Sequence, residues 1–411
     1  MPGKLYTRWM FAWETALTTR DTNRIVRPVE WGFDWLEDFA RPRGLMPDAA
    51  AEHDPLAAED ALSAINRAIL HDPDSFYGYA CPADFRLEAR HPLLFPTNVR
   101  PETLRRDARL RAAAEAGRAK KAQFLRFTSP IRTRYPENDL VNARWYPAPA
   151  DRQAGKPKQA IIVMPQWNAD AFSHNVLCAL FNRFGISALR LSKPYHDIRR
   201  PAELERSDYA VSSNLGRTIS ACRQAVVDIR CCIDWLAQQG YEQFGVLGTS
   251  LGSCYAFIAA ATDRRLQVCA FNHASMNFGD VVWTGQSTRH IRAAFEPVMD
   301  QERLRQLWAA ISPASFMDRF AATRRKALVV HATYDLTFLA RYSRQVLESF
   351  RRKGVDFESR VLPCGHYTTG ETPYKFMDGW FLGSFVYRAF KELAASGSRP
   401  VEQQERELAA G

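Results

Sequence analysis

A serine between two glycines is the sharpest chemical feature of the sequence. Gly248, Ser250 and Gly252 form a G-x-S-x-G pattern that follows an apolar run and opens an Ala-rich segment. Glycines suit these positions because a tight strand-to-helix turn brings neighbouring chain too close for a Cβ atom. The partial positive charge of the helix amino terminus favours an anionic intermediate. The pattern predicts that Ser250 is a nucleophile rather than a structural serine, and Ser253, which has no glycine two residues before it, is the poorer candidate.

A histidine must take the proton of such a serine, because a hydroxyl holds its proton too tightly at neutral pH. His366 is the best candidate, since it follows the predicted strand 357–363 in a short turn beside Gly365. A hydrogen-bonded structural histidine is the alternative. His273 also follows a predicted strand, but it comes before the acid candidate along the chain.

A carboxylate must orient that histidine and stabilise its charged form. Asp335 comes just after the predicted strand 327–332 and precedes His366 by 31 residues. That gap fits one helix and one strand, so both side chains should emerge at the same edge of a sheet. An Asx turn or a helix cap is the alternative role for Asp335. Asp280 is the second candidate for the acid.

Alternating strands and helices are predicted to position these residues. Short apolar or β-branched runs indicate strands at 124–133, 140–147, 160–165, 187–192, 244–248, 266–272, 327–332 and 357–363. Helical patterns lie at 169–184, 214–239, from 251 onwards, 338–353 and 376–393. Such alternation favours an α/β fold with a mostly parallel sheet and helices on both faces. The first two strands are candidates for an antiparallel pair.

Residues 1–121 are predicted to form a helical extension that packs on the main domain. Apolar residues share one side of its first helix, namely Leu5, Trp9, Met10, Trp13 and Leu17. A dimer surface or an interfacial membrane helix is the alternative for this aromatic face. The main domain is expected at 122–393, with an insertion at about 275–322 and a flexible tail at 394–411.

The composition excludes several classes of protein. The chain has 411 residues, of which 46% are hydrophobic, and this is enough apolar material for a large core. We expect neither a membrane-spanning helix nor a secretory signal, because long apolar runs are missing. The net charge of +10 is scattered, and no nucleic-acid-binding motif accompanies it. Eight cysteines without a CxxC spacing argue against a zinc cluster or a disulfide framework and fit a reducing cytoplasm.

The order of Ser250, Asp335 and His366, each after a predicted strand, resembles the α/β-hydrolase superfamily over residues 122–393. The resemblance implies the α/β-hydrolase fold, with Ser250 as nucleophile, His366 as general base and acid, and Asp335 as the orienting acid. It also implies an oxyanion hole, which is a pair of donors for the negative oxygen of the intermediate. The first donor would be the backbone N–H of Leu251.

The second oxyanion donor is where the sequence departs from the superfamily. Many members carry His-Gly after the strand that matches 160–165, but this chain has Pro165, Gln166, Trp167 and Asn168 there. Proline has no N–H, so alignment with His-Gly assigns the second donor to the backbone N–H of Trp167. Gln166 and Asn168 are the alternatives, and both are candidates for substrate contact. The Trp167 ring is predicted to wall the acyl pocket or to pack in the core.

Two further segments are expected to contact substrate. In the superfamily, an insertion such as 275–322 commonly forms a helical cap, whose apolar residues, Trp283 among them, would enclose an acyl or aromatic group. The loop 193–201 is similar to that of a poorly characterised branch of α/β-hydrolase-domain proteins with long N-terminal extensions. Its Tyr195 and His196 are candidates for substrate contact. The two arginines that follow would hold an anionic group of the substrate or form surface salt bridges; they are Arg199 and Arg200.

These features predict a serine hydrolase that cleaves a carboxylic ester through an acyl-enzyme, in the manner of esterases and lipases. The alternatives are an acyltransferase with the same three residues and a hydrolase-like protein that binds without catalysis. The expected substrate is a small-molecule or lipid ester, with no metal, organic cofactor or nucleic acid as partner. Contact with a membrane surface is not favoured, and acyl length, leaving group and oligomeric state stay open.

Overall fold

Nine β-strands form one sheet in the computed structural model, which describes residues 2–397. The spatial order is β1-β2-β3-β5-β4-β6-β7-β8-β9. The strand pairs β1–β2, β2–β3 and β3–β5 are antiparallel, and all later neighbours are parallel. The strands are β1 (Arg86–Arg90), β2 (Ala122–Thr128), β3 (Leu140–Tyr146), β4 (Gln159–Met164), β5 (Ile186–Leu191), β6 (Gln243–Thr249), β7 (Leu266–Asn272), β8 (Lys326–Ala332) and β9 (Asp356–Leu362). This sheet confirms the mostly parallel α/β fold that the sequence predicts.

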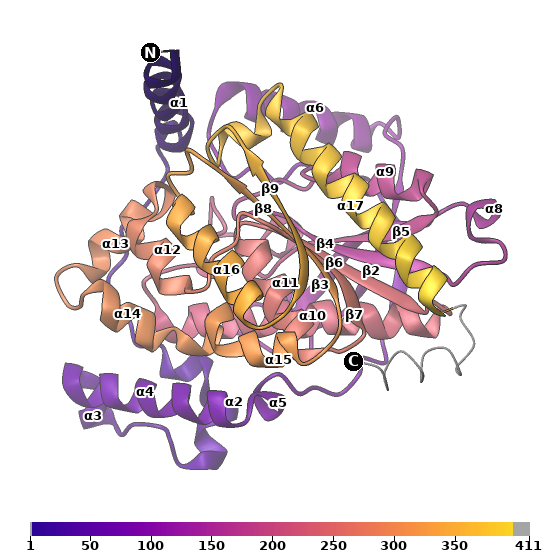
Figure 1. Cartoon of the computed structure of the whole chain (residues 1–411). Coiled ribbons are helices and arrows are strands. Elements are labelled where there is room, and N and C mark those ends of the chain that lie inside the picture. The colour runs from indigo at the N-terminus through magenta and orange to yellow at the C-terminus, as the bar shows by residue number, and fades with distance from the viewer. Residues whose placement is uncertain (1, 398–411) are drawn as a thin grey trace.

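Both faces of the central strands are buried, which explains why β4 is apolar after its first residue, Gln159. Ile161 and Val163 belong to one buried cluster, and Ile162 and Met164 belong to the cluster on the other face. The helices over the first cluster are α9 (Asn175–Arg183) and α17 (Tyr374–Gly397), and those over the second are α10 (Leu215–Gln238), α11 (Leu251–Thr262) and α16 (Ala340–Arg352). Figure 1 shows α17 in yellow, crossing one side of the sheet.

The segment before β2 is built into the main body. Its helices are α1 (Pro2–Thr19), α2 (Glu37–Ala40), α3 (Ala49–His53), α4 (Pro55–His71), α5 (Pro73–Phe76) and α6 (Pro101–Glu115). Leu62 and Ile65 of α4 share a buried cluster with Trp308 and Ile311, which lie far along the chain. The segment also contains β1, which the sequence analysis did not predict. Leu87 and Ala89 share one face of β1, but both are exposed, because β1 is an edge strand.

The connection between β7 and β8 is helical, at the place of the predicted insertion. It contains α12 (Phe278–Thr284), α13 (Arg289–Phe295), α14 (Gln301–Leu307) and α15 (Met317–Ala321). Two further single turns, α7 (Pro136–Asp139) and α8 (Ala150–Gln153), flank β3. At the other end of the chain, α17 continues to Gly397, so the first residues of the predicted tail are helical, and 398–411 lie outside the described residues.

None of the helices within residues 2–397 is long and apolar enough to cross a bilayer. All eight cysteines are free thiols.

Candidate active site

Ser250 lies on a sharp turn between β6 and α11. Its backbone angles are φ 57° and ψ −120°, a conformation that a residue with a side chain rarely adopts. The Ser250 N–H donates to the carbonyl of Asn272 at 2.7 Å, which ties the turn to the end of β7. A Cβ atom on Gly252 would lie 2.2 Å from the carbonyl oxygen of Met164. Glycine is therefore required there for close approach, and this approach brings the end of β4 beside the turn.

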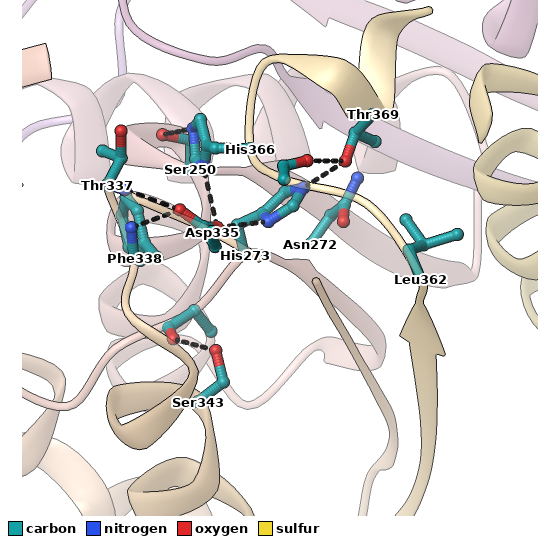
Figure 2. A network of polar contacts seen from close by, with 12 residues as sticks. Ser250, Asn272, His273, Asp335, Thr337, Phe338, Ser343, Leu362, His366 and Thr369 are labelled. Atoms are coloured by element: carbon teal, nitrogen blue, oxygen red, sulfur yellow. Dashed lines mark hydrogen bonds and ion pairs between the residues drawn. The ribbon is translucent and has the colours of Figure 1, made fainter. Parts of the chain in front are cut away.

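The structure brings Ser250, His366 and Asp335 into one hydrogen-bonded line (Figure 2). His366 Nε2 lies 3.0 Å from Ser250 Oγ, and His366 Nδ1 lies 2.9 Å from Asp335 Oδ2. The other oxygen of Asp335 accepts the backbone N–H groups of Thr337 and Phe338 at 2.7 and 2.6 Å. Because the Asp335 side chain is buried and held from two sides, the imidazole faces a fixed carboxylate.

Charges in this line shift the pKa values of its members. Burial opposes protonation of His366, but the Asp335 carboxylate more than offsets this, with help from Glu14, and raises the pKa of His366 above its usual value. Burial also opposes ionisation of Asp335, but the two histidines that face it lower its pKa well below the usual value. The pair therefore favours a carboxylate beside an imidazole that readily becomes charged.

A second histidine shares the same carboxylate. His273 Nδ1 lies 2.9 Å from Asp335 Oδ2, and its Nε2 lies 3.2 Å from Thr369 Oγ1. Burial and the neighbouring His366 lower the pKa of His273, which favours the neutral imidazole, and the ionised Asp335 favours a hydrogen on Nδ1. The sequence analysis set His273 aside on chain order. Its position directly after β7 was the signal that could have placed it at this edge of the sheet.

These three side chains could also be read as a metal site. Within residues 2–397, His273, Asp335 and His366 are the only such trio of His, Cys, Asp or Glu groups, with ligand atoms within 4.8 Å of one another. Both Nδ1 atoms donate to Asp335, however, and His366 Nε2 faces Ser250. A nitrogen that carries a hydrogen cannot bind a metal, so the hydrogen bonds account for the cluster.

Helix α1 supplies a carboxylate that holds the histidine loop. Glu14 is fully buried, and it accepts the backbone N–H groups of Tyr367 and Thr368 at 2.8 and 3.0 Å and the Thr368 hydroxyl at 3.1 Å. A Cβ atom on Gly365 would lie 2.3 Å from Glu14 Oε2. Gly365 thus provides room for this carboxylate. The sequence analysis missed Glu14, because nothing in the spacing links residue 14 to a turn more than 350 residues later.

The backbone N–H groups near Ser250 are compatible with an oxyanion hole. Those of Leu251, Gln166 and Trp167 donate to no group within the described residues. The N–H of Asn168 donates to His196 Nε2 at 3.2 Å, so Asn168 is excluded as an alternative donor. Two of the three proposed positions in the 166–168 turn therefore have a free donor, including the first choice, Trp167.

An apolar pocket of about 510 Å³, counted to its open mouth, adjoins Ser250. Its apolar lining consists of Trp167, Val211, Leu251, Cys254, Phe278, Val281, Val282, Pro313 and Phe338. Helix α12 contributes three of these side chains, so the helical connection between β7 and β8 closes one side of the pocket. The Phe338 ring also stacks on His366, with ring centres 5.4 Å apart. The pocket thus presents apolar walls to a group bound at Ser250.

The other predicted substrate contacts lie outside the lining of this pocket. Tyr195 is fully buried against the rings of Tyr135 and Tyr209. His196 is also buried, and burial lowers its pKa well below the usual value. Its Nε2 accepts from Asn168, so His196 positions the 166–168 turn instead of reaching a substrate.

Asn168 and Trp283 make local contacts, whereas the Gln166 side chain does not. Asn168 Oδ1 accepts the Ser207 N–H at 2.8 Å. Gln166 accepts from Lys193 Nζ only through its backbone carbonyl, and its Oε1 is buried without a hydrogen-bond partner among the described residues. Trp283 is half-buried on α12, beneath the guanidinium of Arg292 at 5.6 Å. Its neighbours Val281 and Val282 line the pocket, because a helix turns successive side chains in different directions.

Three other charged candidates are occupied elsewhere. Asp280 is buried and paired with Arg305 at 2.9 Å, so it does not approach His366. Arg199 is neither a substrate ligand nor a surface residue, since it is fully buried against Asp228 at 2.8 Å. Arg200 donates to the carbonyl of Pro96 at 2.6 Å. The charged groups of these three residues therefore stabilise the fold through contacts with other parts of the chain.

No protein-family model matches the chain, and no curated protein matches it by sequence. Among solved structures, it is similar to acetyl xylan esterase 1 from Thermoanaerobacterium sp. JW/SL YS485, with TM-score 0.52, 14% identity and coverage of 81% of this chain and 93% of that chain. It is also similar to an acetyl xylan esterase from Paenibacillus sp. R4, with TM-score 0.50, 12% identity and coverage of 84% and 98%. Both are α/β-hydrolases, and at these identities the likeness shows the fold: the chain has the α/β-hydrolase fold, as the sequence analysis expected.

A third structure is the acylaminoacyl peptidase of Pyrococcus horikoshii, with TM-score 0.49 and 11% identity. The match covers 66% of this chain and 46% of that chain, so this chain spans less than half the length of the peptidase.

Proposed function

We propose that this chain, which has the α/β-hydrolase fold, hydrolyses a carboxylic ester through an acyl-enzyme formed on Ser250. The observation that carries the proposal is the hydrogen-bonded line from Ser250 Oγ through His366 to Asp335, with contacts of 3.0 and 2.9 Å. A nucleophile, a base within hydrogen-bond reach and a carboxylate that orients the base are what acyl transfer to serine requires. The strained backbone of Ser250 and the free N–H of Leu251 add support.

The reaction would run in two halves. His366 Nε2 takes the proton of Ser250 as Oγ attacks the ester carbonyl, and the N–H groups of Leu251 and Trp167 bind the negative oxygen. His366 then gives that proton to the leaving alcohol. In the second half, His366 takes a proton from water, which attacks the acyl-enzyme, and returns it to Ser250. Asp335 stays ionised and stabilises the imidazolium in both halves.

The substrate would carry a compact apolar acyl or aromatic group. The pocket beside Ser250 supports this, because its walls come mainly from aliphatic and aromatic side chains. We propose that residues 275–322 act as a helical cap, which excludes water from the acyl-enzyme. Eight free thiols favour a reducing compartment such as the cytoplasm.

The test is fluorophosphonate labelling of the purified chain, followed by intact mass measurement and hydrolysis of p-nitrophenyl esters from acetate to palmitate. We expect one covalent adduct and a rate that is highest for short acyl groups. Transfer products in the presence of added alcohol would assign an acyltransferase instead. If the folded protein is not labelled and cleaves no ester, the remaining interpretation is a hydrolase-like protein that binds without catalysis.

The acid limb of the pH profile should lie above the usual histidine range. His366 must be neutral to act as base, and its pKa is raised, so imidazolium accumulates as the pH falls through that raised value. We therefore expect kcat/KM to fall on the acid side with a midpoint above about 6.5. Initial rates between pH 5 and 9 measure this, and a midpoint below the usual value would contradict the favourable Asp335 and Glu14 charges.

Glu14→Gln should move that acid limb to lower pH. The glutamine removes a negative charge that raises the pKa of His366, and its NH₂ group opposes donors of the 367–368 loop. We expect kcat/KM at the optimum to fall about tenfold, the size of one lost charge-assisted hydrogen bond. Thr19→Ala is the control, because this exposed α1 residue bonds only to the carbonyl of Thr15. A uniform loss at every pH, with no shift, would assign Glu14 a structural role alone.

A further inference from the structure

An arginine-rich face lies on the first strands of the sheet. The register places Arg86 opposite Arg126 and Arg144 opposite Arg190. The two pairs share one face, because Arg126 lies opposite Asn142, two residues before Arg144. Like charges directly opposite each other on neighbouring strands destabilise a sheet. The sequence thus retains an arrangement that folding alone disfavours, and such local conflicts are typical of functional sites.

The carboxylates near this face do not balance its arginines. Glu88 alone pairs at 2.8 to 3.5 Å with three of them, namely Arg86, Arg90 and Arg126. Asp84 reaches Arg86, and buried Asp197 pairs with Arg190. Arg144 has no carboxylate partner among residues 2–397, and its guanidinium lies over the Tyr146 ring. Five arginines facing three carboxylates leave an excess of two positive charges.

A hollow of about 480 Å³, counted to its open mouth, lies on this face. Guanidinium groups and apolar side chains both line it; they are Arg90, Arg144 and Arg190, and Leu93, Phe95 and Phe124. The hollow shares no lining residue with the pocket beside Ser250. His91 also lines it, and His91 Nδ1 is buried without a hydrogen-bond partner in the described part of the chain.

The arginines of the hollow differ in how freely they can bind. Arg190 is 3% exposed and already donates to the carbonyls of Ser173 and Asp170, so it acts as a fixed charge. Arg144 makes no hydrogen bond within the described residues, so its full set of donors is available. Arg144 is therefore the group that a ligand would engage first.

We propose that this hollow binds a small molecule that carries a phosphate monoester on an apolar or aromatic body. A phosphate monoester carries close to two negative charges at neutral pH, which matches the excess on this face, whereas a carboxylate would leave one positive charge unbalanced. Guanidinium groups suit phosphate because their N–H donors bind two oxygens in parallel. Phe95, Phe124 and Leu93 would contact the apolar body. The proposal is independent of catalysis at Ser250.

The test is calorimetric titration of the full-length chain with phenyl phosphate, inorganic phosphate and benzoate at low salt. We expect phenyl phosphate to bind most tightly, and Arg144→Gln to weaken its binding about tenfold or more, the effect of losing a charge-assisted contact. Arg264→Gln is the matched control, because it removes the same charge from an exposed position outside the hollow. Arg90→Gln serves as the second variant if Arg144→Gln fails to fold.

Each other outcome overturns part or all of the proposal. Equal binding by the wild type, the hollow variant and the control would mean a diffuse charge effect and no site. If benzoate binds as tightly as phenyl phosphate, the site requires only a single negative charge on the ligand and not a phosphate. If inorganic phosphate binds as tightly as phenyl phosphate, the apolar body of the ligand does not contribute to binding. No binding of any probe by the folded wild type would refute the site altogether.

Discussion

Ser250→Ala should abolish both fluorophosphonate labelling and ester hydrolysis. The fall in kcat should be at least about a thousandfold and approach a millionfold, as for loss of a serine nucleophile elsewhere. The reason is geometric, because Ser250 Oγ is the hydroxyl 3.0 Å from His366 Nε2. Ser253 cannot replace it, since Ser253 is buried and its hydroxyl donates to the carbonyl of Ser250 at 2.7 Å.

Ser253→Ala is the matched control for this experiment. It removes a hydroxyl from the same helix, one turn from the proposed nucleophile, and should keep the covalent adduct and most of the hydrolysis. Intact mass before and after labelling, with the circular dichroism spectrum of each variant, separates lost chemistry from lost structure. Labelling that survives in folded Ser250→Ala would assign the nucleophile to another residue.

Asp335→Asn should combine the second-largest loss of activity with a loss of stability. An asparagine in this position leaves the imidazole in the wrong tautomer, which lowers kcat by about ten-thousandfold in a comparable triad. Here the effect on folding should be larger than usual, because both His273 and His366 donate to the same oxygen of Asp335. An amide NH₂ facing two donors leaves buried groups unpaired, at a cost of about 1–3 kcal/mol each.

Asp280→Asn provides the comparison for Asp335→Asn. Asp280 is equally buried, but it pairs with Arg305 and Gln301 and not with a histidine. Its replacement should lower the free energy of unfolding while leaving kcat within about tenfold of wild type. Denaturant unfolding and single-turnover kinetics measure the two effects separately. If Asp280→Asn loses more activity than Asp335→Asn, Asp280 would be the acid.

The most predictable part of the site consists of residues that local sequence patterns identify. Ser250, Asp335 and His366 each follow a strand, and the carboxyl ends of parallel strands meet at one edge. Knowing the strands was therefore sufficient to expect these side chains near one another. The same local logic failed for Tyr195 and His196, because a loop after a strand can also be buried, as both residues are here.

The least predictable part was the support around the histidine loop. Glu14 reaches residues 367–368 from the other end of the chain, and His273 shares the carboxylate of Asp335 although it precedes it. Strand β1 was missed for a related reason. Charged side chains alternate in β1 with only two apolar ones, Leu87 and Ala89, and both are exposed at the sheet edge, so the segment carried little apolar signal.

The sequence by itself determined the order of the strands from β2 to β9 and of the helices between them, the glycine-flanked turn at Ser250 and the candidates for base and acid. Apolar periodicity and turn residues act over a few positions, so they can be read along the chain. Only the tertiary structure decided which groups surround these residues: the buried carboxylate of Glu14, the apolar pocket wall from α12 and the arginine-rich hollow on β1, β2, β3 and β5. Those contacts join residues far apart in the chain, and their geometry follows from how the whole core packs.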